Sequence, residues 1–297
     1  MRKFEISTDS TCDLYANEVK ENELFFLPLT FTLTDNDGNI TEYKDEFSSP
    51  EEYTEYYEKL HSGLLSRTSM NNPSIHENYF TEMAKAGVKE AIHFTISYGL
   101  CRTVDVAREA VAEVQKTYPD FHCLCVESNT TTLGQGMLVQ IAIDMRNKGK
   151  TLEETFDYVE NIKHKIQHFI IVDDLKSLVR GGRLSAAAGT VGSILQIKPI
   201  IVFNKEGKLE SYKKSKGLNH TIGVIAREFE NYTLNKDYPM ILIGHTGKLD
   251  SAEYLQSKLK ELYNIDVPIR MIGPVIASHL GYGTVAYAFI SNEERPI

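Results

Sequence analysis

Short apolar segments alternate along the chain with amphipathic segments, and this alternation predicts strands separated by helices. Residues 3–8, 90–96 and 122–128 have the length and apolar content of buried strands. Residues 103–118 and 133–147 place apolar side chains three or four positions apart, which is typical of amphipathic helices. The strand–helix–strand order predicts a mostly parallel, Rossmann-like sheet in the first part of the chain.

Three other segments complete the predicted first domain. A helix is expected at 50–60, and another after Asn72-Pro73, where asparagine is a favoured N-cap and proline is favoured in the first turn. Residues 28–48 have the pattern of a small β-hairpin with an Asp-Gly turn, which we expect to be an insertion in this domain.

The pattern changes in the second half of the chain. A helix at 151–166 and a strand at 168–174 lead to residues 198–216, which predict a β-hairpin, a feature that doubly wound sheets do not usually need. The remaining chain predicts helices and strands at 217–232, 239–247, 250–262 and 267–273. We therefore predict two α/β domains, residues 1–160 and 161–297, the second with a mixed sheet.

One uncharged segment after Arg270 approaches the length of a membrane-spanning helix. Pro274, three glycines and His279 interrupt it, so we interpret it as buried strand and loop and expect no transmembrane segment. The first ten residues soon become polar and lack a secretory signal pattern. The four cysteines have spacings unlike those of zinc sites and are too few for a disulfide framework. Together with the missing signal pattern, they predict a cytoplasmic protein.

Composition narrows the range of partners. The chain has 297 residues and a formal net charge of −9, with acidic residues spread along its length. Such a charge argues against nucleic acid and against anionic membrane surfaces as partners. Any anion that the protein binds must therefore meet a local positive site.

Four loops rich in hydroxyl and glycine residues follow predicted strands, at 7–13, 66–74, 96–103 and 127–136. Open α/β sheets bind ligands at the carboxyl ends of their strands, so four such loops on one sheet edge predict a binding cleft. The alternative is that each serine or threonine only caps the helix that follows. For Asp9 and Asp13, capping and turn formation are the favoured interpretation.

The sequence lacks the motifs of several common kinds of site. Two segments are rich in glycine, TLGQGM and RGGRLSAAAGTVG, and neither matches the phosphate loop or the dinucleotide-binding fingerprint. The sequence contains no zinc-binding His-Glu-x-x-His and no Gly-x-Ser-x-Gly hydrolase motif. We expect no metal and no cofactor, and we interpret Ala186–Ala188, Gly189 and Gly192 as small residues that allow another surface to approach closely.

Two arginines, Arg180 and Arg183, flank a pair of glycines. From the residues alone, they suit a helix C-terminus paired with Asp173 or Asp174.

Two further residues also have open interpretations. His279 lies where a ligand anion could be met, or it is a structural hydrogen-bonding group. Cys101 precedes Arg102, whose charge would lower the pKa of a thiol and make it reactive, or it is a small buried side chain.

Six blocks in the same order resemble the DegV family of bacterial fatty-acid-binding proteins, which includes the lipid-carrying subunits of fatty acid kinase. The blocks are STDSTCDL, TSMNNPS, ISYGLCRT, ESNTTTLGQG, VRGGRLS with IKPII, and IGPVIASHLGYGTVAYAF. The resemblance runs nearly from end to end. It implies two α/β domains with one acyl chain buried between them and a carboxylate held by hydroxyl groups.

The resemblance also assigns roles to residues. The family's carboxylate contacts correspond to Thr68, Cys101 and His279. Other residues in the same motifs are Ser69, Ser97, Arg183 and Gly281. Arg180 and Arg183 are implied to lie near the ligand's head group, where a partner kinase would phosphorylate it.

Three positions depart from the family's usual residues. Cys101 replaces a serine, and a thiol is a weaker hydrogen-bond donor than a hydroxyl. Arg102 replaces a glycine: turned inward it would bind the carboxylate and offset the weak thiol, and turned outward it would leave a site suited to another ligand. Tyr98 replaces a serine and would narrow the site.

The resemblance favours a lipid-binding carrier without catalysis of its own. It would bind a long-chain fatty acid in an interdomain tunnel and present the carboxylate to an ATP-dependent fatty acid kinase subunit. The alternative is an enzyme that acts on a small anionic substrate in the same cleft through Cys101 and His279. The sequence does not separate either hypothesis from a regulatory protein in which the lipid is only structural.

Overall fold

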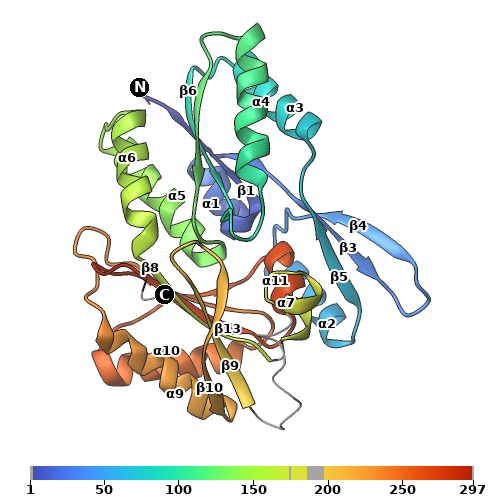
Figure 1. The fold of residues 1–297 in the computed structure, drawn as a ribbon, viewed down its shortest axis with the longest axis vertical. Coiled ribbons are helices and arrows are strands. Elements are labelled where there is room, and N and C mark those ends of the chain that lie inside the picture. Colours follow the sequence, from blue (N-terminus) through green and yellow to red (C-terminus); the bar gives the residue numbers. More distant parts are fainter. Residues whose placement is uncertain (1–2, 174, 186–196, 296–297) are drawn as a thin grey trace.

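The computed structural model describes residues 3–173, 175–185 and 197–295, and this part of the chain forms three β-sheets (Figure 1). The first, sheet A, has four parallel strands in the order β2-β1-β6-β7. Its strands are β1 Glu5–Asp9, β2 Phe25–Leu27, β6 Glu90–Thr95 and β7 His122–Glu127. The predicted parallel sheet is confirmed.

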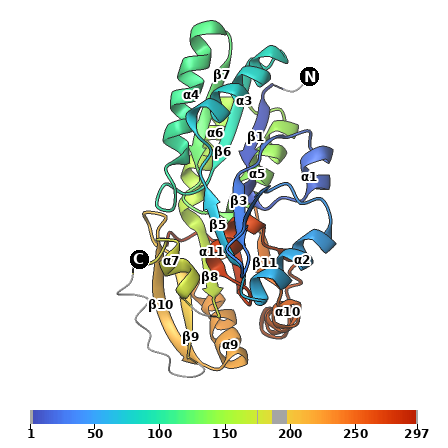
Figure 2. The same cartoon turned by 90° about the vertical axis from the view of Figure 1, so that its right-hand side faces the viewer.

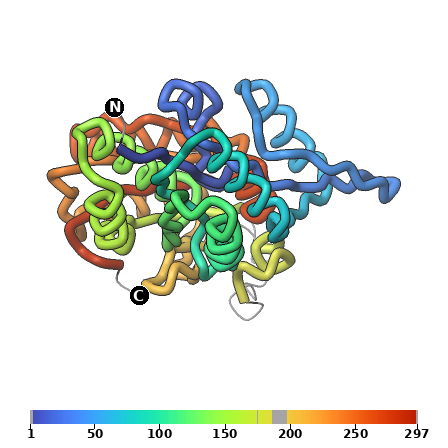
Figure 3. Tube along the Cα trace, turned by 90° about the horizontal axis from the view of Figure 1, so that it is seen from above, coloured from blue at the N-terminus to red at the C-terminus, as the bar shows by residue number. Residues whose placement is uncertain are grey.

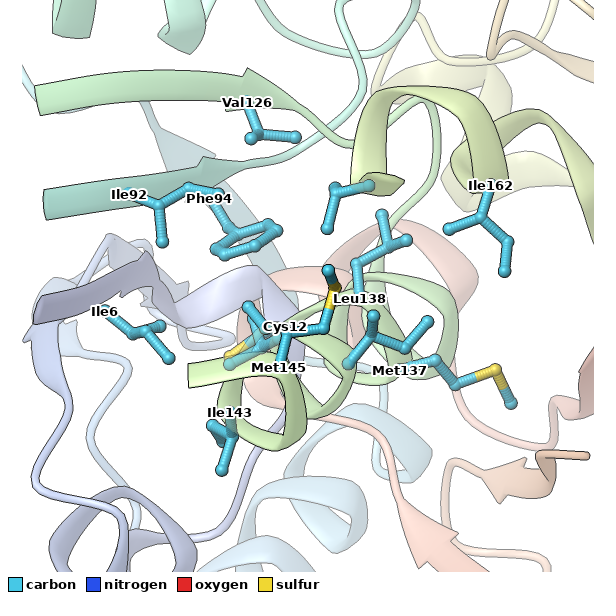
Figure 4. Packing of buried hydrophobic residues seen from close by; sticks show 14 of the residues in the cluster. Ile6, Cys12, Ile92, Phe94, Val126, Met137, Leu138, Ile143, Met145 and Ile162 are labelled. Carbon is cyan, nitrogen blue, oxygen red and sulfur yellow. The ribbon is translucent and has the colours of Figure 1, made fainter. Parts of the chain in front are cut away.

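Helices cover both faces of sheet A. Helices α3 and α4 pack on one face around Phe80 and Val111. Helices α5 and α6 pack on the other face, where Leu138 and Ile162 belong to the same apolar cluster as Ile92 of β6 (Figure 4). The helices of this domain are α1 Ala16–Glu21, α3 Pro73–Lys85, α4 Thr103–Thr117, α5 Thr132–Asn147 and α6 Leu152–Ile162.

The second large sheet, sheet C, is mixed, as predicted. Its six strands lie in the order β10-β9-β8-β13-β11-β12, and only β11 and β12 pair in parallel. The predicted hairpin is formed by β9 and β10. The strands are β8 Ile166–Ile171, β9 Ile197–Phe203, β10 Leu209–Lys216, β11 Ile241–His245, β12 Ile269–Met271 and β13 Val285–Ile290. Helices α9 (Leu218–Glu228) and α10 (Leu249–Tyr263) cover its outer face.

Helix α5 lies between sheets A and C, so the two domains share an apolar core (Figure 2). Its side chains pack with Ile6 and Phe94 of sheet A and with Ala288 and Ile290 of β13. Thirteen of its sixteen residues are buried, which is typical of a helix enclosed on all sides. This packing turns the carboxyl ends of the strands of sheet A toward sheet C.

The predicted 28–48 hairpin is part of a larger unit, sheet B. Strands β3 (Thr30–Thr34) and β4 (Ile40–Lys44) form the hairpin, which projects from the body of the molecule (Figure 3). Strand β5 (Leu65–Ser69) pairs with β3 on the other side. The 66–74 loop therefore does not lie on the edge of sheet A, and the expectation of four loops on one edge was wrong for this segment.

The segment after Arg270 contains a helix that the sequence analysis did not predict. Helix α11 (Pro274–Leu280) begins with Pro274, whose fixed φ suits a first helical turn. It ends at Gly281, which has φ 76°, a conformation open to glycine. Its seven residues are too few to show a clear helical period, and its apolar content resembles that of a strand.

Two helices that pack against α11 complete the fold. Helix α2 (Pro50–His61), which was predicted, contacts α11, and the short helix α7 (Lys176–Arg180) also packs against it.

The boundary that we propose at 160/161 lies between the last strand of sheet A and the first of sheet C. In the part of the chain that the structure describes, every helix is too short or too polar to cross a bilayer. The packing role expected for Ala186–Gly192 lies outside the described residues.

Candidate ligand-binding site

A cavity lies between the two domains, at the carboxyl ends of the strands of sheet A. It has about 650 Å³ of empty volume, part of it open to solvent. Sheet A contributes loop residues, sheet B contributes β5, and helices α7 and α11 close the sides. The polar lining consists of Thr11, Thr68, Ser69, Cys101, Thr131, Thr132, Arg183 and His279.

The rest of the lining is mainly apolar and comes largely from the second domain. Ile170, Phe203 and Leu209 extend from three neighbouring strands of sheet C, and Leu178 and Leu280 extend from α7 and α11. The sequence analysis did not single out these residues, because periodicity does not separate a side chain that lines a cavity from one that packs against a neighbour. The cavity thus combines a small polar set with an apolar wall.

Thr68 and His279 meet in the cavity although 211 positions separate them in sequence. The hydroxyl of Thr68 lies 2.7 Å from His279 Nε2. Burial, together with the positive charges of Arg183 and Arg180, lowers the pKa of His279 to about 4. The imidazole is therefore neutral near pH 7 and carries one N–H, so it can donate one hydrogen bond and accept another.

A buried hydrogen-bond network holds β5 and α11 together beside this pair. The hydroxyl of Tyr56, on α2, lies 2.9 Å from Ser66 Oγ and 2.8 Å from Ser278 Oγ. The two serine hydroxyls are themselves 2.7 Å apart. Because Ser66 is two residues before Thr68 and Ser278 adjoins His279, the network fixes the elements that carry both polar groups.

Gly181, the first of the two glycines between Arg180 and Arg183, has a steric role. A Cβ at Gly181 would lie 2.3 Å from Nδ1 of His279, so only glycine lets the end of α7 pack against the imidazole. Arg183 lines the cavity and donates a hydrogen bond to the carbonyl oxygen of Gly181. Arg180 is exposed and donates to Ser177 Oγ at 3.2 Å.

The suggested pairing of these arginines with Asp173 or Asp174 receives no support from the described contacts. The carboxylate of Asp173 forms an ion pair with Lys198. Asp174 lies outside the described residues.

The residues of the 96–103 loop separate into two groups. Cys101 lines the cavity, and its sulfur lies 3.1 Å from the hydroxyl of Thr103. Ser97 is fully buried and donates to the carbonyl oxygen of Gly207 at 2.8 Å, which joins this loop to the β9–β10 hairpin. Ser97 therefore lies outside the cavity lining and connects the two domains.

Arg102 and Tyr98, the other two residues that differ from the family's usual ones, point away from the site. Arg102 forms an ion pair with Asp105 at 2.9 Å and its side chain is 71% exposed. Its guanidinium also lies over the ring of Tyr98, which is itself exposed. Of the two arrangements considered for Arg102, the structure has the outward one.

Ser69 and Gly281 complete the residues that the resemblance assigned. Ser69 lines the cavity at the end of β5 and is exposed. Gly281 lies at the C-terminus of α11, outside the lining, where its carbonyl oxygen accepts a hydrogen bond from Thr246 at 2.7 Å.

Three threonines line the cavity but were not among the assigned residues. Thr11 and Thr131 are joined by a 3.3 Å hydrogen bond from the Thr131 hydroxyl to the Thr11 carbonyl oxygen. Thr132 has φ 47°, which is strained for a β-branched residue, and its buried hydroxyl has no hydrogen-bond partner. Their place in hydroxyl-rich loops after predicted strands was the signal that pointed to them.

Asp9 holds these loops in place. Its carboxylate accepts hydrogen bonds from the N–H of Thr11 at 3.0 Å, the side-chain amide of Gln135 at 2.9 Å and the N–H of Ile96 at 3.2 Å. This agrees with the turn-forming role favoured by the sequence. Among the described residues, no three His, Cys, Asp or Glu side chains gather in a way that would hold a metal ion.

Comparison with known proteins gives close agreement over the whole chain. The DegV family model, described as "Uncharacterised protein, DegV family", matches residues 3–292. A DegV domain-containing protein of Clostridium perfringens, CPE0026, is 35% identical over 297 residues, which is 100% of both chains.

Solved structures share the fold. A DegV family protein from Thermus thermophilus, described by its fatty acid binding, has a TM-score of 0.81 and 25% identity, covering 98% of this chain and 100% of that one. The Streptococcus pneumoniae Fatty Acid Kinase (Fak) B3 protein, solved with linoleic acid, has a TM-score of 0.79 and 19% identity, covering 97% and 99%. The resemblance seen in the sequence is confirmed, and the chain belongs to the DegV family.

Proposed function

We propose that the protein binds one long-chain fatty acid in the interdomain cavity, with the carboxylate at Thr68 and His279 and the acyl chain along the apolar wall. The observation that carries this proposal is that one cavity combines a polar set, which includes the hydrogen-bonded pair Thr68 and His279, with an apolar wall. Burial of about fourteen methylenes at about 0.8 kcal/mol each contributes roughly 11 kcal/mol before ordering costs. The polar pair then serves mainly to satisfy the buried carboxylate.

The head group would receive its hydrogen bonds from two side chains. His279 Nε2–H donates to the Thr68 hydroxyl, which leaves the Thr68 O–H to donate to the carboxylate, and the Cys101 thiol is a weaker second donor. Arg102 does not offset the weak thiol, because it is paired with Asp105 outside the cavity. Arg183 lines the cavity and is the charged group suited to the carboxylate.

We further propose that the protein presents the carboxylate to an ATP-dependent kinase and does no catalysis itself. Exposed Arg180 and cavity-lining Arg183 would meet the added phosphate. The Fak B3 protein among the similar folds names a kinase system, which supports a partner of this kind. Incubation of the loaded protein with a fatty acid kinase and ATP should yield acyl phosphate, and the protein alone with ATP should yield none.

Titration of lipid-stripped protein with a long-chain fatty acid tests the binding proposal. Thr68→Val removes one hydrogen bond to a charged group, so the dissociation constant should rise roughly tenfold or more. Thr41→Val, on exposed β4 of the same sheet, is the matched control and should leave it unchanged. Equal affinity of Thr68→Val and the unmodified protein would remove Thr68 from the site.

A further inference from the structure

A second cavity lies beside sheet A, near helix α1 and the end of β4. It has about 480 Å³ of empty volume, part of it open to solvent, and it shares no lining residue with the first cavity. Two carboxylates, Asp13 and Asp45, line it. Both side chains belong to residues that are only 5% exposed.

These carboxylates lack the partners that buried charges require. Neither oxygen of Asp13 and not Oδ2 of Asp45 makes a hydrogen bond of full geometry. The Thr132 hydroxyl and the Gly273 N–H beside Asp13, like the Ser10 hydroxyl and the Val275 N–H beside Asp45, offset only part of the rise in pKa that burial causes. A Cβ built on Gly273 would lie 2.4 Å from Asp13 Oδ1 and 3.6 Å from Asp45 Oδ1, so the two oxygens are no further apart than the sum of these distances. Two such groups repel each other strongly in a low-dielectric site unless a proton or a cation neutralises them.

The cation closest to this pair is already engaged elsewhere. Arg270 forms a hydrogen bond of 3.0 Å with Glu18 Oε1, and its guanidinium lies 4.4 Å from the ring centre of Tyr15. Its hydrogen bond to Asp13 goes to the backbone carbonyl oxygen, at 3.5 Å. Its charge lowers the pKa of the Asp13 carboxyl group, but burial has the larger effect and raises that pKa overall. Arg270 therefore does not neutralise the pair, which leaves a place for a cationic ligand.

The rest of the lining indicates what kind of cation fits. Phe26, Phe47 and Tyr53 line the cavity, together with the aliphatic side chains of Leu14 and Val19. A metal ion prefers several oxygen ligands. Ser10 and Glu46 also line the cavity, but among the residues that the structure describes no three His, Cys, Asp or Glu side chains gather in a way that would hold a metal ion. An ammonium group has three N–H donors for carboxylates and is attracted to aromatic faces, and a short carbon chain attached to it would cover the aliphatic groups.

We propose that this cavity binds a small primary alkylamine, with the ammonium between Asp13 and Asp45 and the carbon chain against Phe26, Phe47 and Tyr53. The pair needs only one added positive charge, because burial raises the pKa of Asp13 to about 7 and that of Asp45 well above its usual value, so that one carboxyl group keeps its proton. The site lies apart from the fatty acid cavity and does not depend on fatty acid binding.

Calorimetric titration of the full chain with n-butylamine and with putrescine tests the proposal. We expect saturable binding of one amine per chain, weakened at least tenfold by Asp13→Asn, which removes the carboxyl group that ionises more readily, and weakened less by Asp45→Asn. Asp157→Asn, an exposed carboxylate on α6, is the control and should bind as the unmodified protein does. Thermal unfolding supplies a second measurement, since the amine should raise the Tm of the unmodified protein but not that of Asp13→Asn.

Three results would overturn the proposal. One is the absence of saturable amine binding to the unmodified protein. Another is unchanged amine affinity in both folded asparagine variants. The third is binding of Mg²⁺ at Asp13 and Asp45 that n-butylamine does not displace, which would assign the cavity to a metal ion.

Discussion

At the residue scale, the site depends on the position of one imidazole. His279 is held by Thr68 on one side and by the close approach of Gly181 on the other. The sequence presented Gly181 only as one of two glycines between arginines. Its role became visible when α7 and α11 were placed side by side, because a steric limit depends on a neighbour that is distant in sequence.

Gly181→Ala tests this steric role. The added methyl group would overlap the His279 ring, so the imidazole must shift and the Thr68 hydrogen bond should weaken. We expect a several-fold higher dissociation constant for fatty acid, measured by titration. Gly223→Ala, on α9 with open space around the new methyl group, is the control and should keep the original affinity. Unchanged affinity in Gly181→Ala would show that the imidazole position is not critical.

At the element scale, three segments far apart in sequence form the support of the site. Helix α2, strand β5 and helix α11 are joined through Tyr56, Ser66 and Ser278. The sequence predicted α2 from its proline and its pattern, and it placed the hydroxyl loop after a strand. It did not predict α11, because seven apolar residues carry little periodic information.

Tyr56→Phe tests the support. Loss of the hydroxyl leaves the two serines bonded to each other, so the free energy of unfolding should fall by about 1 kcal/mol, and fatty acid affinity should also fall. Urea unfolding and fatty acid titration measure the two effects. Tyr53→Phe, also buried on α2, is the control for affinity. A Tyr56→Phe protein that loses stability but binds fatty acid normally would show that the network supports the fold and not the site.

At the scale of the whole molecule, the sequence predicted the two α/β domains and their sheet types because strand–helix alternation and a hairpin leave clear patterns. It could not predict that β5 joins a third sheet, since strand pairing is decided by contacts between distant segments. The residues themselves made Cys101 and His279 candidates, and the family resemblance added Thr68 and grouped the three around one carboxylate. The apolar wall did not, because Ile170 and Phe203 look like any other buried residue in a strand.

The arrangement of the two domains gives the cavity between them one polar wall and one apolar wall. Sheets A and C are joined through α5, while the cavity occupies the remaining space between them, with threonines from sheet A and apolar side chains from sheet C. A ligand with one anionic end and a long apolar chain satisfies both walls at once. A small polar substrate would leave the apolar wall of sheet C uncovered.

Native mass spectrometry of the chain purified from bacterial cells tests this claim most directly. The account predicts one added mass per chain, equal to that of a long-chain fatty acid, lost on delipidation and restored when the fatty acid is added back. Protein that carries no acyl mass in repeated preparations, and gains none with added fatty acid, would contradict it.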